Sequence, residues 1–379
     1  MVDKPNTQNA RPRIALCHDW LVARRGGELV LEAIAEAIEP IADLDVLYTM
    51  FDSGAYIGTH VDALQRRTSF LNVLPRRLRR WAMPLYPLAV RDVSRKLNAR
   101  HHQKSYDLVI STHSSAIKAI RTPKGVPHVC YCHAPARYIW NQPGDYAGGL
   151  QGLGLSAIRP MYKVWDRKTA RRVDLFLANS THTQTQIRRS YKCASAVCFP
   201  PVRTDFFTPS EQSLRRDHWL AVGALVPYKR FDLAIEAANA AEQPLHIIGD
   251  GPERARLEKL AGPTISFVQA KTDAQLRQAY RAAKLLIFPQ LEDFGIVAIE
   301  AQACGTPVVA FSEGGARDTV LDGKTGSLFN EQTVDALRAA IERCPRHAEL
   351  ACRGHAERFG EAVFCDQIQS AIRGFIRRV

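Results

Sequence analysis

The chain has 379 residues, a length that suggests two domains at about 100–200 residues each. Hydrophobic residues make up 46% of it and charged residues 23%, a mix that argues against a disordered or fibrous protein. No segment approaches the run of about 20 apolar residues that crosses a bilayer, which excludes an integral membrane protein. The first thirteen residues are polar, so we expect no export by a signal peptide and a cytoplasmic location.

The formal net charge of +13 is unevenly distributed along the chain. Residues 1–200 carry 29 Lys and Arg against 15 Asp and Glu, a net charge of +14. Residues 201–379 carry 22 against 23, a net charge of −1. Clustered positive charge attracts anionic partners, so we expect the first half of the chain to face a negative ligand or surface.

Short apolar runs alternate with helix-period segments along the chain, a pattern typical of parallel βαβ units. The expected strands are Arg13–His18, Leu44–Met50, Asp107–Thr112, His128–His133, Asp174–Asn179, Trp219–Ala224, Pro244–Gly249, Thr264–Gln269, Leu285–Pro289, Pro307–Phe311 and Gly326–Phe329. The expected helices include Glu28–Ile38, Phe231–Ala241, Glu253–Leu260, Ala274–Ala283 and Val334–Arg343. This order predicts an α/β protein with two doubly wound, Rossmann-like parallel sheets.

Two prolines, Pro200 and Pro201, interrupt the pattern midway and mark the expected domain boundary. We therefore expect domains at residues 1–200 and 201–355, followed by a last helix within 356–379. Ligands of open parallel sheets bind beyond the carboxyl ends of the strands, so functional residues are expected there.

Paired glycines, Gly26 and Gly27, follow the first expected strand and precede a helix. Such a turn lets backbone N–H groups approach an anion or a sugar, although a plain turn would have the same sequence. Asp43 and Asp45 form an Asp-x-Asp tripeptide of the kind that holds metal ions in some enzymes. No further ligands accompany it, so we expect no metal site there.

The nine cysteines include no Cys-x-x-Cys pair, which favours reduced thiols over disulfides or zinc. Cys130 and Cys132 would share one face of a strand, where a metal pair is the alternative to buried small side chains. His133 directly follows these residues at the tip of the expected strand, where its ring could bind a hydroxyl group. A histidine satisfied within the core or a loop is the alternative.

Cationic and aromatic residues are interleaved after residue 75 of the chain. A segment of this composition is typical of an interfacial patch for anionic headgroups, whereas a solvated cationic face is the plainer alternative. No nucleic-acid-binding signature accompanies it, so we expect no nucleic acid. The expected membrane patch comprises Arg76, Arg77, Arg79, Arg80 and Trp81.

Two further motifs follow strands of the second half. Gly223 precedes Lys229 and Arg230, two cations at a helix start that oppose the helix dipole unless an anion binds there. Glu292 and Glu300 lie either side of a turn into a helix, where each carboxylate can accept hydrogen bonds from two hydroxyl groups. The N–H groups of Phe294, Gly295 and Ile296 would be free to bind a phosphate or sugar oxygen.

The segment from Glu292 to Glu300, together with the sequence of residues 303–310, closely resembles family 4 glycosyltransferases of the GT-B fold. The segments 226–230 and 249–253 share this resemblance, which covers residues 13–379. The segments 18–21, 25–28 and 131–135 resemble bacterial polysaccharide mannosyltransferases. The resemblance implies two Rossmann-like domains facing across a cleft, an N-terminal domain for the acceptor, a C-terminal domain for the nucleotide sugar, and a last helix that crosses back.

The resemblance also implies roles for individual residues. Glu292 would hold the hydroxyls of the donor sugar, and Glu300 the ribose diol of the nucleotide. Lys229, with Arg230, would neutralise the diphosphate, and Gly223, Phe294, Gly295 and Ile296 would complete the donor site. His133 would contact the transferred sugar, and Gly26 and Gly27 would line the acceptor and phosphate side.

Two positions depart from the family pattern. Ala224 stands where many relatives carry an arginine, so one phosphate cation is missing, and we expect Arg230 to compensate. Asp318 stands where relatives usually carry a glutamate.

The sequence thus predicts a retaining hexosyltransferase that needs no metal or other cofactor. The expected hexose is mannose, with GDP-mannose as its donor, and the expected acceptor is a lipid-linked saccharide or a polysaccharide. We expect the enzyme to be a peripheral protein at the inner face of the cell membrane. One alternative is the same enzyme with a UDP-sugar donor. The other is a non-catalytic two-domain sugar-binding protein.

Overall fold

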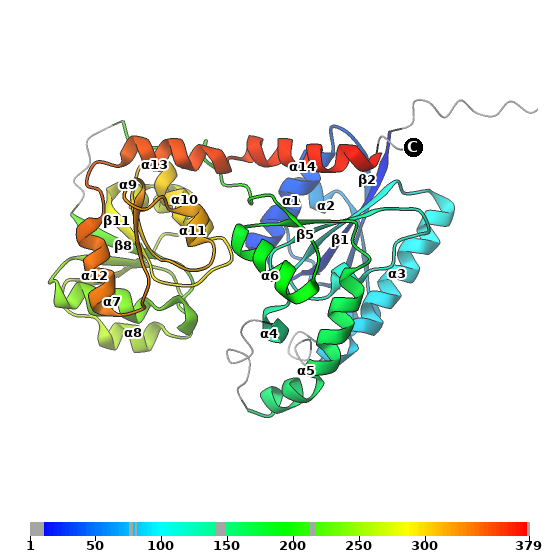
Figure 1. Cartoon of the computed structure of the whole chain (residues 1–379), viewed down its shortest axis with the longest axis horizontal. Helices are drawn as coiled ribbons and strands as arrows, with labels where there is room; N and C mark the ends of the chain where they lie inside the picture. The colour runs from blue at the N-terminus through cyan, green and yellow to red at the C-terminus, as the bar shows by residue number, and fades with distance from the viewer. Residues whose placement is uncertain (1–10, 76–78, 80–81, 141–148, 212–216, 377–379) are drawn as a thin grey trace, which may run out of the picture. The chain divides into compact units, whose positions relative to one another are not determined.

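The structure is a computed structural model that describes residues 11–75, 79, 82–140, 149–211 and 217–376. Its contacts divide the chain into two compact units (Figure 1). Unit 1 comprises Met1–Cys198 together with Phe364–Val379, and unit 2 comprises Phe199–Val363. The boundaries expected from the sequence were 200/201 and 355/356. Residues 356–363 group with unit 2 because the Phe359 ring packs against Phe199 and Phe294, at centroid distances of 5.0 and 5.6 Å.

Unit 1 is built on a seven-stranded parallel sheet with the order β3-β2-β1-β4-β5-β6-β7. Its strands are β1 (Arg13–Leu21), β2 (Asp43–Asp52), β3 (Gln65–Thr68), β4 (Leu108–His113), β5 (His128–Cys132), β6 (Leu175–Ala178) and β7 (Ala196–Val197). Its helices are α1 (Gly26–Ile38), α2 (Thr59–Asp62), α3 (Tyr86–Gln103), α4 (Arg137–Trp140), α5 (Gly149–Ala170), α6 (Thr181–Tyr191) and most of α14 (Glu361–Ile376).

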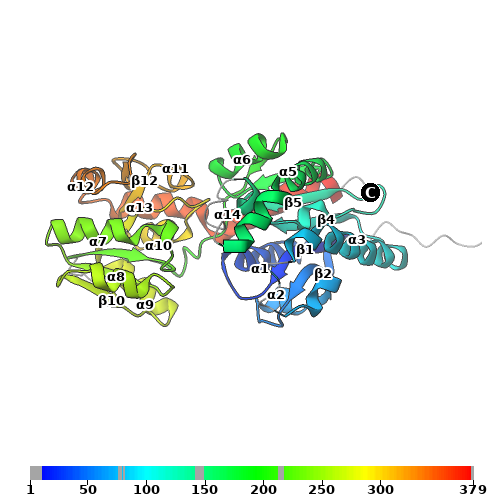
Figure 2. The same ribbon diagram turned by 90° about the horizontal axis from the view of Figure 1, so that it is seen from below.

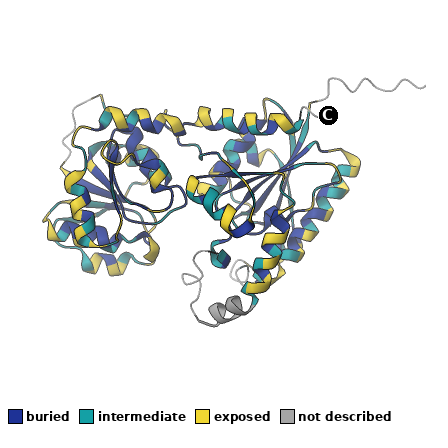
Figure 3. Ribbon diagram, in the orientation of Figure 1, coloured by how far each residue is buried: buried dark blue, intermediate teal, exposed yellow. Residues whose placement is uncertain are grey.

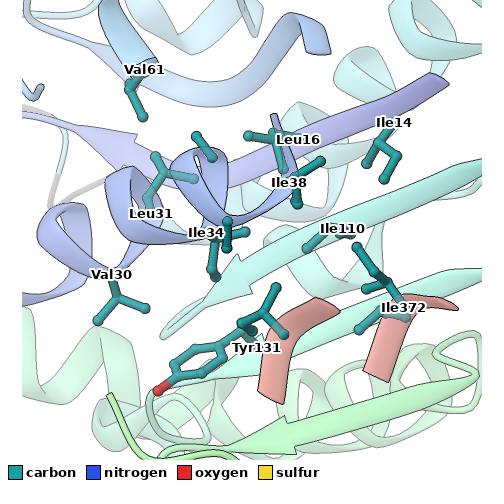
Figure 4. Close-up of a cluster of buried hydrophobic side chains, with 14 of the residues drawn as sticks. Ile14, Leu16, Val30, Leu31, Ile34, Ile38, Val61, Ile110, Tyr131 and Ile372 are labelled. Atoms are coloured by element: carbon teal, nitrogen blue, oxygen red, sulfur yellow. The ribbon is translucent and has the colours of Figure 1, made fainter. Parts of the chain in front are cut away.

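Alternate residues of β1 supply two hydrophobic layers, one on each face of this sheet. Ile14 and Leu16 pack with α1 and α14, as Figure 4 shows for Ile34, Ile38 and Ile372. Ala15 and Cys17 belong to the layer beneath α3. Successive side chains of a strand point to opposite faces of the sheet, so a strand that is buried on both faces needs apolar residues at odd and at even positions.

Helix α14 was expected from the sequence to return to the first domain. Its buried residues Phe364, Ile368 and Ile372 lie at a spacing of four and join the core of unit 1. The Phe364 ring lies 5.9 Å from that of Tyr131 on β5. Four-residue spacing places these side chains on one helical face, which explains how a single helix completes this core.

Unit 2 is built on a six-stranded parallel sheet with the order β10-β9-β8-β11-β12-β13. Its strands are β8 (His218–Val222), β9 (Leu245–Ile248), β10 (Ile265–Val268), β11 (Ala283–Phe288), β12 (Val308–Phe311) and β13 (Gly326–Phe329). Its helices are α7 (Phe231–Ala240), α8 (Arg254–Leu260), α9 (Asp273–Ala282), α10 (Ile296–Ala303), α11 (Ala316–Thr319), α12 (Val334–Arg343) and α13 (Glu349–Ala356). Helices α7, α8 and α12 cover one face, and α9, α10 and α13 cover the other (Figure 2).

The fold class expected from the sequence is confirmed in both units, since each is a parallel sheet with helices on both faces. The central strands are buried, the edge strands β3, β7 and β10 are partly exposed, and the outer helix faces are exposed (Figure 3). The chain reverses its direction of strand addition between β1 and β4 in unit 1 and between β8 and β11 in unit 2. Crevices at the carboxyl ends of such strand pairs are the usual ligand sites of doubly wound sheets. Of the described residues, no helix is both long and apolar enough to span a membrane.

Candidate functional site

The loop after β8 brings a lysine against a glycine in unit 2. Gly223 has φ +147°, a conformation that favours glycine, and a Cβ there would lie 2.9 Å from Nζ of Lys229. Lys229 ends the short helix η7 (Pro227–Lys229), just before α7 begins. The absence of a side chain at position 223 therefore makes room for the Lys229 ammonium group.

Glu292 follows β11, the strand that pairs directly with β8. Its Oε1 lies 2.6 Å from Nζ of Lys229, and the two side chains are only 20% and 11% exposed. Lys229 and Glu292, which the family resemblance assigned to one donor site, thus form an ion pair after the two strands between which the topology reverses. This nearly buried ion pair holds an ammonium group and a carboxylate side by side. Together they could bind a ligand that has both negative charge and hydroxyl groups.

Arg230 has its backbone in the left-handed region, with φ +52°, and its side chain turns to neighbours within unit 2. Its Nε donates to Asp232 at 3.2 Å, and its Nη1 donates to Gln332 at 3.2 Å. Gln332 in turn donates to the carbonyl of Pro289 at the end of β11, at 2.7 Å. Gln332, which the sequence did not indicate, thus links the Arg230 guanidinium to the strand that precedes Glu292.

The turn into α10 depends on Gly295, which has φ +92°. A Cβ there would lie 2.7 Å from the ring of Phe288, so both the conformation and the space favour glycine. No side chain caps the start of α10. The ring of Phe294 is buried against Phe199 and Phe359, so only its backbone can face a ligand, and Ile296 is half-buried.

A second glycine pair, Gly314 and Gly315, packs on the backbone of Glu292. The N–H of Gly315 donates to the Glu292 carbonyl at 2.8 Å, and a Cβ on either glycine would collide with residues 292–294. From the sequence, only Asp318 of this segment was considered for a role, and the two glycines were given none. A Gly-Gly dipeptide in the loop after β12 was the available signal.

Glu300 lies on α10, and its Oε2 accepts a 2.8 Å hydrogen bond from the hydroxyl of Tyr280 on α9. Burial raises the pKa of Glu300, and the hydrogen bond from Tyr280 and the charge of Arg203 partly offset this effect. Tyr280 was not predicted, because nothing in the spacing of the two residues links them.

In unit 1, Gly27 lies close to His133, whereas Gly26 does not. A Cβ at Gly27 would lie 3.7 Å from Nε2 of His133 and 4.0 Å from Cε1 of His18, whereas a Cβ at Gly26 would meet nothing within 4 Å. His133 directly follows β5, and its ring lies 5.2 Å from that of Tyr131.

The His133 ring is neutral at ordinary pH. Burial, then the nearby His18, lowers its pKa to about 3. Its Nε2 is buried without a hydrogen-bond partner among the described residues. Buried polar atoms are normally paired, so this nitrogen is a candidate to bind a ligand hydroxyl.

Asp19, next to His18 on β1, is the chief buried carboxylate of this region and was not predicted as a site residue. Its oxygens accept hydrogen bonds of 2.7–2.8 Å from the N–H groups of residues 114–117, which follow β4. Burial alone would raise its pKa, but His113 and these N–H groups outweigh burial, so the pKa lies below its usual range. Through these hydrogen bonds Asp19 connects the carboxyl end of β1 to the loop after β4.

The Asp-x-Asp tripeptide has a structural role. Asp43 pairs with Arg11 at 3.4 Å, and Asp45 is bound by Arg13 and by Arg100, the latter at 3.0 Å. Within the described ranges, no group of three or more His, Cys, Asp or Glu side chains is arranged to hold a metal ion.

Most of the expected membrane patch, Arg76, Arg77, Arg80 and Trp81, lies outside the described residues. Arg79 is described, and its guanidinium lies 5.0 Å from the ring centroid of Phe51. Unit 1 also contains a cavity of about 290 Å³. It opens at the amino end of β2 and is lined by Arg11, Ala35, Glu39, Ala42, Asp43, Leu44, His60, Ala63 and Leu64.

Two family models match the chain. Residues 45–206 match "Glycosyltransferase Family 4", and residues 203–362 match "Glycosyl transferases group 1". A curated relative, the D-inositol 3-phosphate glycosyltransferase of Mycobacteroides abscessus, is 34% identical over 200 residues, which are 46% of this chain and 45% of the relative. The chain thus spans about half the length of the curated relatives it matches.

Two solved structures resemble almost the whole chain. Sucrose-phosphate synthase from Thermosynechococcus elongatus has a TM-score of 0.76 at 20% identity, covering 97% of this chain and 100% of that one. Anabaena HepE, solved in complex with UDP and glucose, has a TM-score of 0.68 at 20% identity, covering 95% and 99%. These likenesses are of fold, and the fold they share with this chain is GT-B.

Proposed function

We propose that this chain, whose two segments match the family 4 and group 1 glycosyltransferase models, is a retaining hexosyltransferase that uses a nucleotide sugar. The observation that supports this most is the 2.6 Å pair of Lys229 and Glu292 at the switch point of unit 2. A nucleotide sugar has a diphosphate for the ammonium group and sugar hydroxyls for the carboxylate. A ligand with only one of these features would leave one member of the pair without a role.

In the proposed reaction the bond between the sugar and the diphosphate loosens first. Lys229, Arg230 and N–H groups at helix starts, including those of Phe294, Gly295 and Ile296, would meet the charge that develops on the leaving diphosphate. The acceptor oxygen then forms a bond to the anomeric carbon on the same face. Its proton passes to the departing phosphate oxygen, so the reaction requires no side-chain base and, in this proposal, no metal ion.

The donor that we propose first is GDP-mannose, because segments of the chain resemble polysaccharide mannosyltransferases. A UDP-sugar is the alternative, since the likeness to HepE, a protein solved with UDP, extends over nearly the whole fold. Glu300 would hold the ribose of either nucleotide, and Gly223 would keep the space beside Lys229 open.

We place the acceptor on unit 1. His133 and Gly27 lie together there, and the buried Nε2 of His133 has no partner among the described residues. The acceptor we propose is a lipid-linked saccharide or a growing polysaccharide. An anionic membrane surface fits this unit because residues 1–200 carry the excess of Lys and Arg.

A screen of ligand-induced thermal shifts tests the donor first, with GDP-mannose, UDP-glucose, UDP-galactose and the free sugars. We expect a nucleotide sugar to raise the melting temperature and a free sugar to have no effect. The stabilising donor is then incubated with membrane extract, and nucleoside diphosphate release is measured. Tight binding of a free sugar without release from any donor would contradict the proposal and favour a sugar-binding protein.

A further inference from the structure

Tyr280 is a fully buried tyrosine that neither the family resemblance nor the sequence pattern brought into the site. Its hydroxyl donates to Oε2 of Glu300 at 2.8 Å. The hydroxyl of Thr306 donates to the Tyr280 carbonyl at 2.6 Å, and the ring packs edge-on against Phe207 at 5.7 Å. These contacts fix both ends of the tyrosine, so its hydroxyl is held at one place.

The hydrogen bond restrains only one oxygen of Glu300. Among the described residues, Tyr280 is the one donor to this carboxylate, which leaves Oε1 and the second lone pair of Oε2 for a ligand. Arg203 acts on Glu300 electrostatically, but its guanidinium is paired with Asp273 at 2.8 Å. Tyr280 is therefore the residue that fixes the orientation of the free oxygen.

We propose that Tyr280 is a positioning residue that aims Glu300 at the two ribose hydroxyls of the nucleotide and so contributes to the selection of ribonucleotides. This inference rests on the proposed function, in which Glu300 binds the ribose. A vicinal diol donates two hydrogen bonds, and a carboxylate accepts both only when its plane faces the diol. The tyrosine supplies that constraint from a neighbouring helix.

The test is calorimetric binding of GDP and UDP, together with their 2′,3′-dideoxy analogues, to the whole chain. The variant Tyr280→Phe keeps the ring and removes the donor. Because a hydrogen bond to a charged group is involved, we expect it to weaken the better-bound ribonucleotide about tenfold. We expect no change for the dideoxy analogue. Equal weakening of both ligands, or of neither, would overturn the inference.

A pH series separates positioning from a loss of packing. Tyr280 stabilises the ionised carboxylate, so its loss raises the pKa of Glu300 further. Ribonucleotide affinity of Tyr280→Phe should therefore decline at a higher pH than that of the wild-type chain as the pH is lowered. Identical pH profiles would contradict a role that acts through Glu300.

Two further variants serve as controls. Tyr48→Phe removes another buried tyrosine hydroxyl, which lies 3.2 Å from that of Tyr106 in unit 1, and should leave nucleotide affinity unchanged. In a Glu300→Gln background, Tyr280→Phe should have no further effect on ribonucleotide binding. If the wild-type chain binds no nucleoside diphosphate, the proposed function fails, whereas wild-type binding with an unaffected Tyr280→Phe variant refutes only the role of Tyr280.

Discussion

Nζ of Lys229 lies 2.6 Å from Oε1 of Glu292, although the two residues belong to loops that follow different strands, β8 and β11. The two strands are parallel neighbours, so the loops that follow them start at the same carboxyl end of the sheet. Each residue therefore balances the charge of the other until a ligand binds. A ligand that carries both a diphosphate and sugar hydroxyls can replace this pairing with one interaction for each residue.

Replacing either member of the pair should abolish or severely reduce transfer. We expect Lys229→Ala and Glu292→Ala each to lower the rate of nucleoside diphosphate release at least about a hundredfold, since each removes transition-state stabilisation by a charged group. The rate is measured with the donor found in the thermal-shift screen. The exposed Lys259→Ala on α8 is the matched control and should retain full activity. Wild-type rates in the Lys229 or Glu292 variant would refute the assignment.

Gly295→Ala should destabilise unit 2. The substitution forces a side chain into φ +92° and against the ring of Phe288, so we expect the free energy of unfolding to fall by about 1–3 kcal/mol. Urea denaturation measures the change. Gly354→Ala on α13 provides the comparison, because a Cβ there meets nothing within 4 Å, and it should stabilise by about 0.5–1 kcal/mol. Equal effects of the two substitutions would show that the turn is not restricted to glycine.

Unit 1 should lose stability as the pH falls below about 6.5. Burial lowers the pKa of His18 to about 4 and of His128 and His133 to about 3, from an ordinary value of 6.5. Between these values the unfolded chain binds protons that the folded chain does not, so folding becomes less favourable as the pH decreases. Urea denaturation at pH 7, 6 and 5 measures this, and His128→Asn should reduce the dependence on pH. A stability independent of pH over this range would contradict the buried, neutral state of these rings.

Helix α3 should take part in binding anionic membranes. Leu85, just before it, and Leu88 are 41% and 52% exposed, and the side chains of Arg91 and Arg95 are exposed on the same helix. Apolar and basic side chains together favour the interface of an anionic bilayer. We expect cosedimentation with phosphatidylglycerol vesicles that decreases with salt, and little with phosphatidylcholine alone.

The matching variants compare two exposed leucines. Leu88→Ser combined with Arg91→Glu should reduce vesicle binding several-fold, whereas Leu350→Ser, at a 90% exposed position on unit 2, should not. If both variants bind vesicles as the wild-type chain does, α3 is not part of a membrane surface.

Most strands could be predicted because their apolar runs are continuous and end in loops rich in glycine and proline. Gly326–Phe329 and Val334–Arg343 agree with β13 and α12 residue for residue. Two strands were missed. Strand β3, with the sequence Gln-Arg-Arg-Thr, is polar and lies at a sheet edge, and β7 at the other edge has only two residues. An edge strand is less buried than a central one and needs fewer apolar residues, so the hydrophobic pattern of the sequence does not reveal it.

By itself, the sequence determined the alternation of strands and helices, and it placed Gly27, His133, Lys229, Glu292 and Glu300 after the carboxyl ends of strands, because periodicity and glycine content are local properties. The tertiary structure alone decided which of these side chains meet. It brought Tyr280 to Glu300, Gly315 to Glu292, and Asp19 to the N–H groups of residues 114–117. Such contacts join segments that are distant in sequence, and a hydrogen bond between them leaves no spacing pattern in the chain.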